Sequence, residues 1–235
     1  MNPGELMNPK LILFDIDGTL VLTGGAGMRA LNRACEDLVG RRDALDGIPL
    51  AGRTDWIILQ DSLSRMGRDL DVSLFAALRD RYLGYLQQEI ELPGHGVKAV
   101  MPGVRELLDR LHARDDVFLG LVTGNFEAGA RIKLDHFDLW KYFRCGAFGD
   151  DAADRNALVP FAVSRARESG APQVLARDVL VVGDTPHDVA CALAAGATPI
   201  GVATGSFSIE ELRASGAGIV LRDFSDGSAF DALVG

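Results

Sequence analysis

The sequence predicts an α/β fold, a doubly wound parallel sheet that carries an inserted helical-bundle cap domain. Three apolar runs, at 11–14, 117–122 and 179–182, are the basis for the sheet. Runs that are apolar at every position are typical of strands buried on both faces of a parallel sheet. From residue 102 onward, stretches of helical pattern alternate with apolar runs. This alternation implies right-handed crossovers between parallel strands.

The remaining elements of the sheet domain follow from turn residues and periodicity. Pro102 and Gly103 are expected to open a helix that runs to about residue 111, because the first turn tolerates a proline. Residues 21–26 contain two adjacent glycines and are expected to form a flexible exit from the first strand. Further strands are expected at 145–148, 200–203 and 219–221, and further helices at 126–137, 156–168 and 186–195.

Between the first and second strands the pattern is helical. Three amphipathic helices are expected at 28–38, 56–66 and 74–90, each with apolar residues on one face. Pro93-Gly94-His95-Gly96 is typical of a hinge. We therefore expect a core domain formed by residues 1–22 and 96–235, and a cap domain at 23–95.

Composition limits the classes of partner. The chain has 235 residues, 48% of them apolar, and 33 acidic residues against 24 basic ones give a net charge of −9. This balance argues against a nucleic-acid binder, whose affinity depends on basic residues that meet phosphates, and against binding to an anionic membrane surface. No signal peptide, membrane span or disulfide framework is expected, so we expect a cytoplasmic protein. Nothing in the pattern specifies an oligomeric state.

Two acidic residues, Asp15 and Asp17, end the first apolar run. Burial of a lone carboxylate is costly, so Asp15 is expected where the strand end opens onto a cation. Residues i and i+2 of an extended chain point to the same side, so the two carboxylates are expected to converge. Gly18 then lets the chain turn away. The alternative is an ordinary turn, because Asp-Gly is a common turn dipeptide.

Polar residues also follow the two other long strands. Thr123, Gly124 and Asn125 follow 117–122, and a segment that contains Asp184 and Asp188 follows 179–182. Parallel strands present their carboxyl ends at one edge of the sheet, where ligands bind in such folds. The polar groups after all three strands are therefore expected to meet.

The expected cluster of four carboxylates, from Asp15, Asp17, Asp184 and Asp188, requires a bound cation. Two charges about 4 Å apart repel by about 4 kcal/mol at an effective dielectric constant near 20. An all-oxygen donor set suits Mg²⁺, which also bridges to phosphate. The Thr123 hydroxyl and the Gly124 amide can donate to a phosphoryl oxygen. This combination predicts phosphoryl transfer to a carboxylate nucleophile.

Three motifs in this order, Asp15-Ile-Asp-Gly-Thr-Leu, Val122-Thr-Gly-Asn and Gly183-Asp-Thr-Pro-His-Asp188, resemble those of the haloacid dehalogenase-like (HAD) superfamily of hydrolases. The resemblance covers essentially the whole chain. It includes a helical cap between the first and second motifs, as in the phosphoglycolate phosphatase and phosphoglucomutase-like members.

The resemblance implies a role for each motif residue. Asp15 would be the nucleophile that becomes an aspartyl-phosphate, and Asp17 the general acid and then the general base. Mg²⁺ would be held by the Asp15 carboxylate, the Asp17 backbone carbonyl and Asp184, with Asp188 behind these direct ligands. Thr123 and Gly124 would bind the phosphate, with Asn125 beside them. True dehalogenases of the superfamily lack the second acid, so Asp17 favours a phosphatase.

The chain departs from the family at one position. The family has a lysine shortly before the last motif, but this chain has no lysine after Lys141. Arg155 is the expected replacement, since a guanidinium supplies the charge and a bidentate grip on phosphate, although with a different geometry. The alternative is a surface arginine paired with Asp154.

In the cap, Arg53 could reach the substrate anion. The alternative is a charged neighbour of a helix start at which Thr54 or Asp55 is the N-cap.

The expected function is Mg²⁺-dependent hydrolysis of a small phosphorylated metabolite under the cap, as in phosphoglycolate phosphatases. The alternatives are a phosphosugar mutase of the same superfamily and a non-catalytic, metal-binding module that is phosphorylated at Asp15. The mutase would return the phosphoryl group to a sugar. The module would need neither Asp17 nor a cap.

Overall fold

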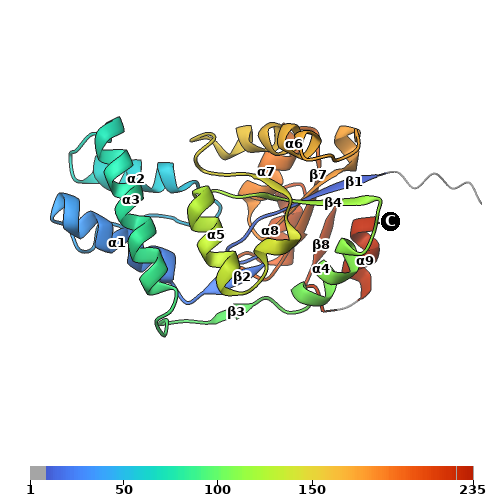
Figure 1. Cartoon of the computed structure of the whole chain (residues 1–235), viewed down its shortest axis with the longest axis horizontal. Helices are drawn as coiled ribbons and strands as arrows, with labels where there is room; N and C mark the ends of the chain where they lie inside the picture. Colours follow the sequence, from blue (N-terminus) through green and yellow to red (C-terminus); the bar gives the residue numbers. More distant parts are fainter. Residues whose placement is uncertain (1–8, 226, 235) are drawn as a thin grey trace, which may run out of the picture.

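The computed structural model of this chain describes residues 9–225 and 227–234 (Figure 1). The N-terminal segment, in which no signal peptide is expected, lies mostly outside the described residues. Within the described residues a six-stranded sheet runs in the order β5-β4-β1-β6-β7-β8, with every neighbouring pair parallel. Its strands are β1 (Lys10–Phe14), β4 (Val117–Val122), β5 (Cys145–Ala147), β6 (Val179–Gly183), β7 (Thr198–Val202) and β8 (Ile219–Leu221). The predicted doubly wound parallel sheet is confirmed.

Helices cover both faces of this sheet because β1 is apolar at successive positions. Ile12 and Phe14 pack in one cluster with residues of α4 (Val104–His112), α5 (Glu127–His136) and α9 (Gly227–Val234). Leu11 and Leu13 pack in a second cluster with α6 (Leu158–Glu168) and α7 (Pro186–Ala194). Figure 1 shows α6 and α7 on one side of the strands and α4 and α9 on the other. Successive side chains of a strand point to opposite faces, so β1 anchors both layers.

The direction of winding reverses at β1. From β1 the chain builds outward through β4 to β5, and afterwards through β6, β7 and β8 (Ile219–Leu221) on the other side. Helix α8 (Ile209–Ala214) precedes β8, and 3₁₀ turns lie at Trp140–Tyr142, Arg155–Ala157 and Ala176–Asp178. A crevice at the carboxyl ends of the strands is expected at such a reversal. This places β1, β4 and β6 around one potential binding site.

The segment at 24–97 contains a separate group of helices, α1 (Ala26–Val39), α2 (Asp55–Arg65) and α3 (Val72–Glu89). These helices lie beyond one end of the sheet (Figure 1). They share an apolar cluster of their own, to which the core contributes Phe126. On this packing we keep residues 23–95 as the proposed cap domain.

The expectation of a flexible exit at 21–26 is wrong. Val21–Thr23 forms strand β2, which pairs antiparallel with β3 (Lys98–Val100), and α1 already begins at Ala26. Both strands are three residues long, and the sequence gives too little alternation at that length to signal them. The two-stranded sheet joins the chain segments that enter and leave the helical group.

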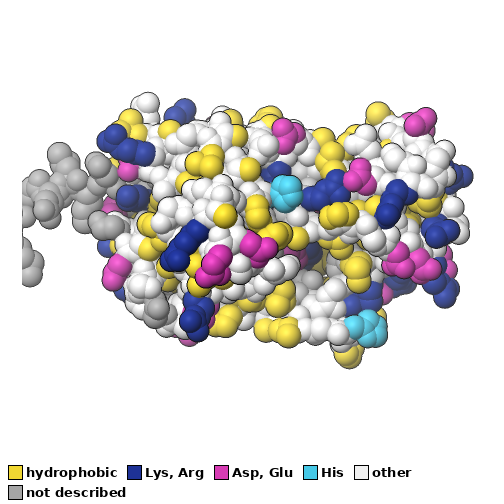
Figure 2. All heavy atoms as spheres, turned by 180° about the vertical axis from the view of Figure 1, so that it is seen from behind, with side chains coloured by type: hydrophobic (Ala, Val, Ile, Leu, Met, Phe, Trp, Pro, Cys, Tyr) yellow, Lys and Arg dark blue, Asp and Glu magenta, His cyan; other side chains and the backbone are white. Residues whose placement is uncertain are grey.

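Two further observations bear on partners. Among the described residues, no helix has the length and apolarity that crossing a membrane requires. On the face drawn in Figure 2, Lys and Arg side chains are interspersed with Asp and Glu.

Replacement of Phe14 tests the role of β1 as the central strand. The Phe14 ring is fully buried and makes edge contacts with Phe143 and Phe224, at centroid distances of 6.2 Å and 6.4 Å. We expect Phe14→Ala to lower the free energy of unfolding by about 3–5 kcal/mol in urea denaturation, because it leaves a cavity. Phe161→Ala on α6, where the ring is 44% exposed, is the matched control and should cost about 1 kcal/mol or less. Equal losses would contradict the assignment.

Candidate active site

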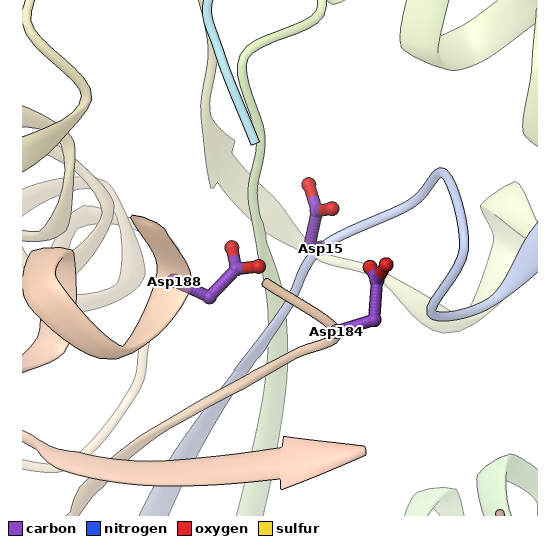
Figure 3. A group of neighbouring side chains, drawn as sticks. All are labelled: Asp15, Asp184 and Asp188. Atoms are coloured by element: carbon purple, nitrogen blue, oxygen red, sulfur yellow. The ribbon is translucent and has the colours of Figure 1, made fainter. Parts of the chain in front are cut away.

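The site is built around three carboxylates at the carboxyl edge of the sheet. Asp15 follows β1, Asp184 follows β6, and Asp188 lies in the first turn of α7. One carboxylate oxygen from each lies within 4.8 Å of the other two, and all three residues are buried. Figure 3 shows the three side chains arising from separate segments, with their carboxylates close together. The predicted convergence of the strand ends is therefore found for these three acids.

The chain between Gly18 and Leu20 fixes Asp184. The Thr19 hydroxyl donates to Asp184 Oδ1 at 2.9 Å. Gly18 has φ +84°, and a Cβ atom at this position would clash with the Asp184 carboxylate. The Asp-Gly-Thr sequence thus supplies both the turn and the space that let the first motif pack against the last one.

Arg155 lies inside this cluster. Its Nη2 is 2.9 Å from Asp15 Oδ1 and also forms an ion pair with Asp188. The Arg155 side chain is buried, and its Nε has no hydrogen-bond acceptor among the described residues. The structure therefore places Arg155 beside Asp15 and disfavours the surface pair with Asp154, whose carboxylate instead accepts from the Asn156 amide.

Burial shapes the protonation of the cluster. It raises the pKa of Asp184 to about 8, and the nearby carboxylates of Asp188 and Asp15 add to the shift. Burial also raises the pKa of Asp15 to about 6, against the opposing effect of the Arg155 guanidinium. The desolvated carboxylates favour protons unless a cation is present. Oxygen donors that need a cation are the set that Mg²⁺ prefers, so the residues present fit this ion.

The carboxylate of Asp17 lies apart from the three-acid group, which corrects the expectation that four carboxylates share one position. Its Oδ2 accepts hydrogen bonds from Lys133 Nζ at 2.6 Å and from Asn125 Nδ2 at 2.8 Å. Lys133 Nζ also donates to Asn125 Oδ1 at 2.6 Å. The side chain of Asp17 is 44% exposed and that of Lys133 only 5% exposed. The two carboxylates diverge because the chain is already turning at Asp17, where regular strand geometry no longer applies.

Thr123 and Gly124 follow β4 at the same edge. The Thr123 hydroxyl accepts from Asn125 Nδ2 at 2.8 Å and is buried beside the acids. A Cβ atom at Gly124 would overlap the backbone carbonyl of Arg53, so glycine permits the close approach of the helical group. The second motif therefore has two contacts, one with Asp17 through Asn125 and one with the cap.

The segment 53–55 docks on the core at this motif. The Asp55 amide donates to the Gly124 carbonyl at 2.8 Å, and the Phe126 amide donates to Asp55 Oδ2 at 3.0 Å. The Thr54 hydroxyl donates to the Ala153 carbonyl at 2.8 Å. It also accepts from the Ile57 amide as the N-cap of α2, as the alternative interpretation of this segment expected.

Arg53 lines the same chamber but is bound within the cap. Its Nη2 pairs with Asp61 Oδ2 at 2.6 Å and its Nη1 donates to the Pro49 carbonyl. The chamber has a volume of about 780 Å³, and Asp15, Asp184 and Arg155 lie on its core side. All the residues expected in the site, apart from the buried Asp188 behind it, line this one space.

Two residues of this region were not among the candidates from the sequence. Lys133 is a lysine on the buried face of α5, beside Gly129, Ala130 and Leu134. A single charge on an otherwise apolar helix face directly after the Thr-Gly-Asn motif is a signal that could have found it. Asp55 was considered only as a helix cap, and nothing local indicates its bond to Phe126.

The fold and the site together define the class of protein, an α/β enzyme with an acidic centre at the edge of a parallel sheet. Comparison with known proteins agrees. A family model described as haloacid dehalogenase-like hydrolase matches residues 12–202. A phosphoglycolate phosphatase from Rhodospirillum rubrum is 31% identical over 222 residues, which cover 92% of this chain and 88% of the relative.

Solved structures show the same fold at lower identity. A HAD hydrolase from Entamoeba histolytica superposes with a TM-score of 0.71 at 18% identity, covering 96% of this chain and 99% of the other. CbbY from Rhodobacter sphaeroides, solved with phosphate, gives a TM-score of 0.69 at 20% identity, covering 95% and 99%.

The chain belongs to the haloacid dehalogenase-like hydrolase family. Within that family it is a phosphatase, a phosphoric monoester hydrolase, which confirms the predicted superfamily and enzyme class.

The raised pKa values of the acids predict how pH would affect a metal ion bound between them. A metal ion needs ionised carboxylates, so protons on Asp184 and Asp15 compete with it, and the competition grows as pH falls through about 8 and about 6. We expect Mg²⁺ affinity to weaken by about tenfold or more from pH 8 to pH 5, with protons released on binding. Isothermal titration calorimetry in buffers of different ionisation enthalpy measures both quantities. An affinity that does not change with pH would contradict this.

Asp55 gives a second pH effect, on stability. Burial raises the pKa of Asp55 to about 6 from the usual 3.8, against the opposing charge of Lys133. The folded state therefore holds this proton more tightly, so the cost of ionising Asp55 is fully present above pH 6 and disappears below pH 4. Asp55→Asn keeps an oxygen acceptor for the Phe126 amide and removes that cost. The free energy of unfolding of Asp55→Asn minus that of wild type, measured by urea denaturation, should be about 1–2 kcal/mol larger at pH 8 than at pH 5. A difference independent of pH would contradict it.

Proposed function

We propose that this phosphatase is Mg²⁺-dependent and hydrolyses a small phosphorylated metabolite through an aspartyl-phosphate at Asp15. The observation that carries the proposal is the buried grouping of Asp15 with Asp184, Asp188 and Arg155, in which the Arg155 guanidinium touches the nucleophile at 2.9 Å. A carboxylate held between a cation site and a guanidinium is placed to attack phosphorus while charge on the phosphoryl oxygens is neutralised.

The first half-reaction transfers the phosphoryl group to Asp15. A carboxylate oxygen of Asp15 forms a bond to phosphorus as the bond from phosphorus to the leaving oxygen breaks. Asp17 donates a proton to that leaving oxygen, so the organic part departs as an alcohol. The hydrogen bonds from Lys133 and Asn125 to Asp17 Oδ2 fix the position of the acid while its other oxygen stays available.

The second half-reaction restores the enzyme. Asp17, now ionised, takes a proton from a water molecule, and the water oxygen forms a bond to phosphorus. The bond between phosphorus and Asp15 breaks, so inorganic phosphate leaves and Asp15 is again a carboxylate. One residue serves as acid and then as base because its protonation state alternates between the two steps.

Mg²⁺ would be held by the carboxylates of Asp15 and Asp184 and by the backbone carbonyl of Asp17. When bound, the ion would neutralise the three-acid cluster and the phosphoryl charge. Asp188 supports this set from behind. Its Oδ2 accepts from the amide and hydroxyl of Thr185, and its Oδ1 pairs with Arg155, so it holds the arginine and the loop that carries Asp184.

The phosphate would bind between Thr123, Gly124 and Arg155, with Asn125 holding the Thr123 hydroxyl. The Arg155 Nε lacks an acceptor among the described residues, and Thr123, Gly124 and Arg155 all line the chamber. Donors directed at a phosphoryl group account for this arrangement better than a purely structural arginine does.

The organic part of the substrate would lie under the cap. Arg53 and its neighbours would contact it and exclude water during the reaction. The Rhodospirillum rubrum relative is a phosphoglycolate phosphatase, so small phosphorylated acids and alcohols are the first compounds to test.

Replacement of the nucleophile tests the proposal. We expect Asp15→Asn to lower kcat for phosphate release from 4-nitrophenyl phosphate with Mg²⁺ by about a thousandfold or more, because an amide is a poor nucleophile. Circular dichroism and thermal unfolding report whether the variant is folded. Glu36→Gln, on an exposed face of α1 where Glu36 pairs with Arg42, is the control and should keep wild-type rates.

The outcomes separate this function from its alternatives. A folded Asp15→Asn variant with near-wild-type turnover contradicts the nucleophile. Steady release of free phosphate supports a phosphatase. Transfer of phosphate to a sugar without release indicates a mutase, and a single stoichiometric phosphorylation of the chain indicates a non-catalytic acceptor.

A further inference from the structure

A buried tyrosine, Tyr82, lines the chamber and has no role in the proposed mechanism. Tyr82 lies on α3 and is 1% exposed, and its ring meets the edge of Phe126 at a centroid distance of 6.0 Å. Tyr82 lines the chamber, yet its hydroxyl has no hydrogen-bond partner among the described residues. Burial raises the pKa of Tyr82 well above its usual value, so the hydroxyl is neutral and can donate or accept.

Lys133 brings a second unused donor to the same place. An ammonium group has three N–H bonds, and Lys133 Nζ spends two of them on Asp17 and Asn125. Within the described part of the chain, no acceptor is found for the third. The lysine is 4% exposed, so any acceptor for this N–H has to come from the chamber.

Gly27 shows that the two groups converge on one point. A carbon atom built as its Cβ would lie 3.5 Å from Lys133 Nζ and 3.8 Å from the Tyr82 hydroxyl. Gly27 lies in the first turn of α1, so the niche is bounded by two cap helices and by core helix α5. No ligand atom can occupy that point itself, because it lies one bond from the Gly27 Cα atom, but the two distances place both polar groups around the space beside Gly27.

The charges around the niche determine which kind of ligand atom it favours. The ammonium of Lys133 is already paired with Asp17. The negative charges of Asp55 and Asp17 both raise the pKa of the Tyr82 hydroxyl, which shows that both lie near it. The nearby cap cations are paired as well, Arg29 with Glu89 and Arg53 with Asp61. A further carboxylate would meet the charge of Asp55, and that of Asp17 whenever Asp17 is ionised, whereas an uncharged oxygen would only gain hydrogen bonds.

We propose that the niche between Gly27, Tyr82 and Lys133 binds a hydroxyl oxygen of the leaving group. The substrate class is then a phosphorylated alcohol with a second, uncharged hydroxyl close to the ester, in preference to a phosphorylated hydroxy acid. Tyr82 is then a specificity residue. Lys133 contacts both the niche and Asp17, and Asp17 is the acid that protonates the leaving oxygen, so the niche lies on the side of the leaving group. This inference rests on the proposed function and narrows its substrate.

Three esters that differ in one group test the niche. They are 2-hydroxyethyl phosphate, ethyl phosphate and phosphoglycolate, which carry a hydroxymethyl, a methyl and a carboxylate group on the same carbon. With Mg²⁺ at pH 7.5 we expect kcat/KM for 2-hydroxyethyl phosphate to exceed that of each of the others by about fivefold or more. Equal values for the hydroxyethyl and ethyl esters, or a preference for phosphoglycolate, would overturn the proposal.

Variants assign the preference to the niche. Tyr82→Phe keeps the ring and removes the hydroxyl, so the ratio of kcat/KM between the hydroxyethyl and ethyl esters should fall to about one. Gly27→Ala places a methyl group in the niche, favours the helix and should lower the same ratio. Gly84→Ala is the matched control on α3, because a Cβ there meets no atom within 4 Å, and the ratio should stay at its wild-type value. A ratio that Tyr82→Phe leaves unchanged, as a purely structural role would, overturns the assignment.

Binding separates this inference from the function on which it rests. If neither these esters nor 4-nitrophenyl phosphate releases phosphate, the proposed function fails. Calorimetry then measures the affinity of the Mg²⁺-loaded wild-type chain for the same three esters and tests whether the niche binds the hydroxyl group. Tighter binding of the hydroxyethyl ester, reduced by Tyr82→Phe, supports it, and equal affinities overturn it.

Discussion

The structure depends on the burial of three carboxylates against one guanidinium at the edge of the sheet. Asp15, Asp184 and Asp188 come from separate segments, and Arg155 lies between two of them. Three negative charges and one positive charge in a desolvated position are unfavourable unless a cation joins them. The apolar packing of β1 and β6 supplies the stability that holds these groups in place.

The second organising feature is the contact between the cap and the Thr123–Phe126 segment. Asp55 bonds to this segment at two points, the Gly124 carbonyl and the Phe126 amide. Asn125, between those two points, holds Asp17 together with Lys133. The residues that dock the cap are therefore neighbours in sequence of the group that positions the acid, so cap position and acid position are mechanically connected.

Much of the fold and of the site could be predicted because the relevant signals are local. Continuous apolar runs identify β1, β4 and β6, and the parallel rule brings Asp15, Thr123 and Asp184 to one edge. Arg155 also lies where the missing family lysine led us to expect a cation. The strands β2 and β3 were missed because three residues give no measurable alternation. The divergence of Asp17 from Asp15 was missed because the turn begins one residue earlier than assumed.

The sequence by itself determined which elements form and which acids stand at strand ends, since periodicity and chain order decide both. Only the tertiary structure decided which groups on different elements face one another. Lys133 reaches Asp17 across 116 positions of the chain, and Tyr82 shares a niche with it from another helix. Such contacts depend on the rotation and the separation of packed helices, which are set by the packing of many side chains together and not by any local pattern.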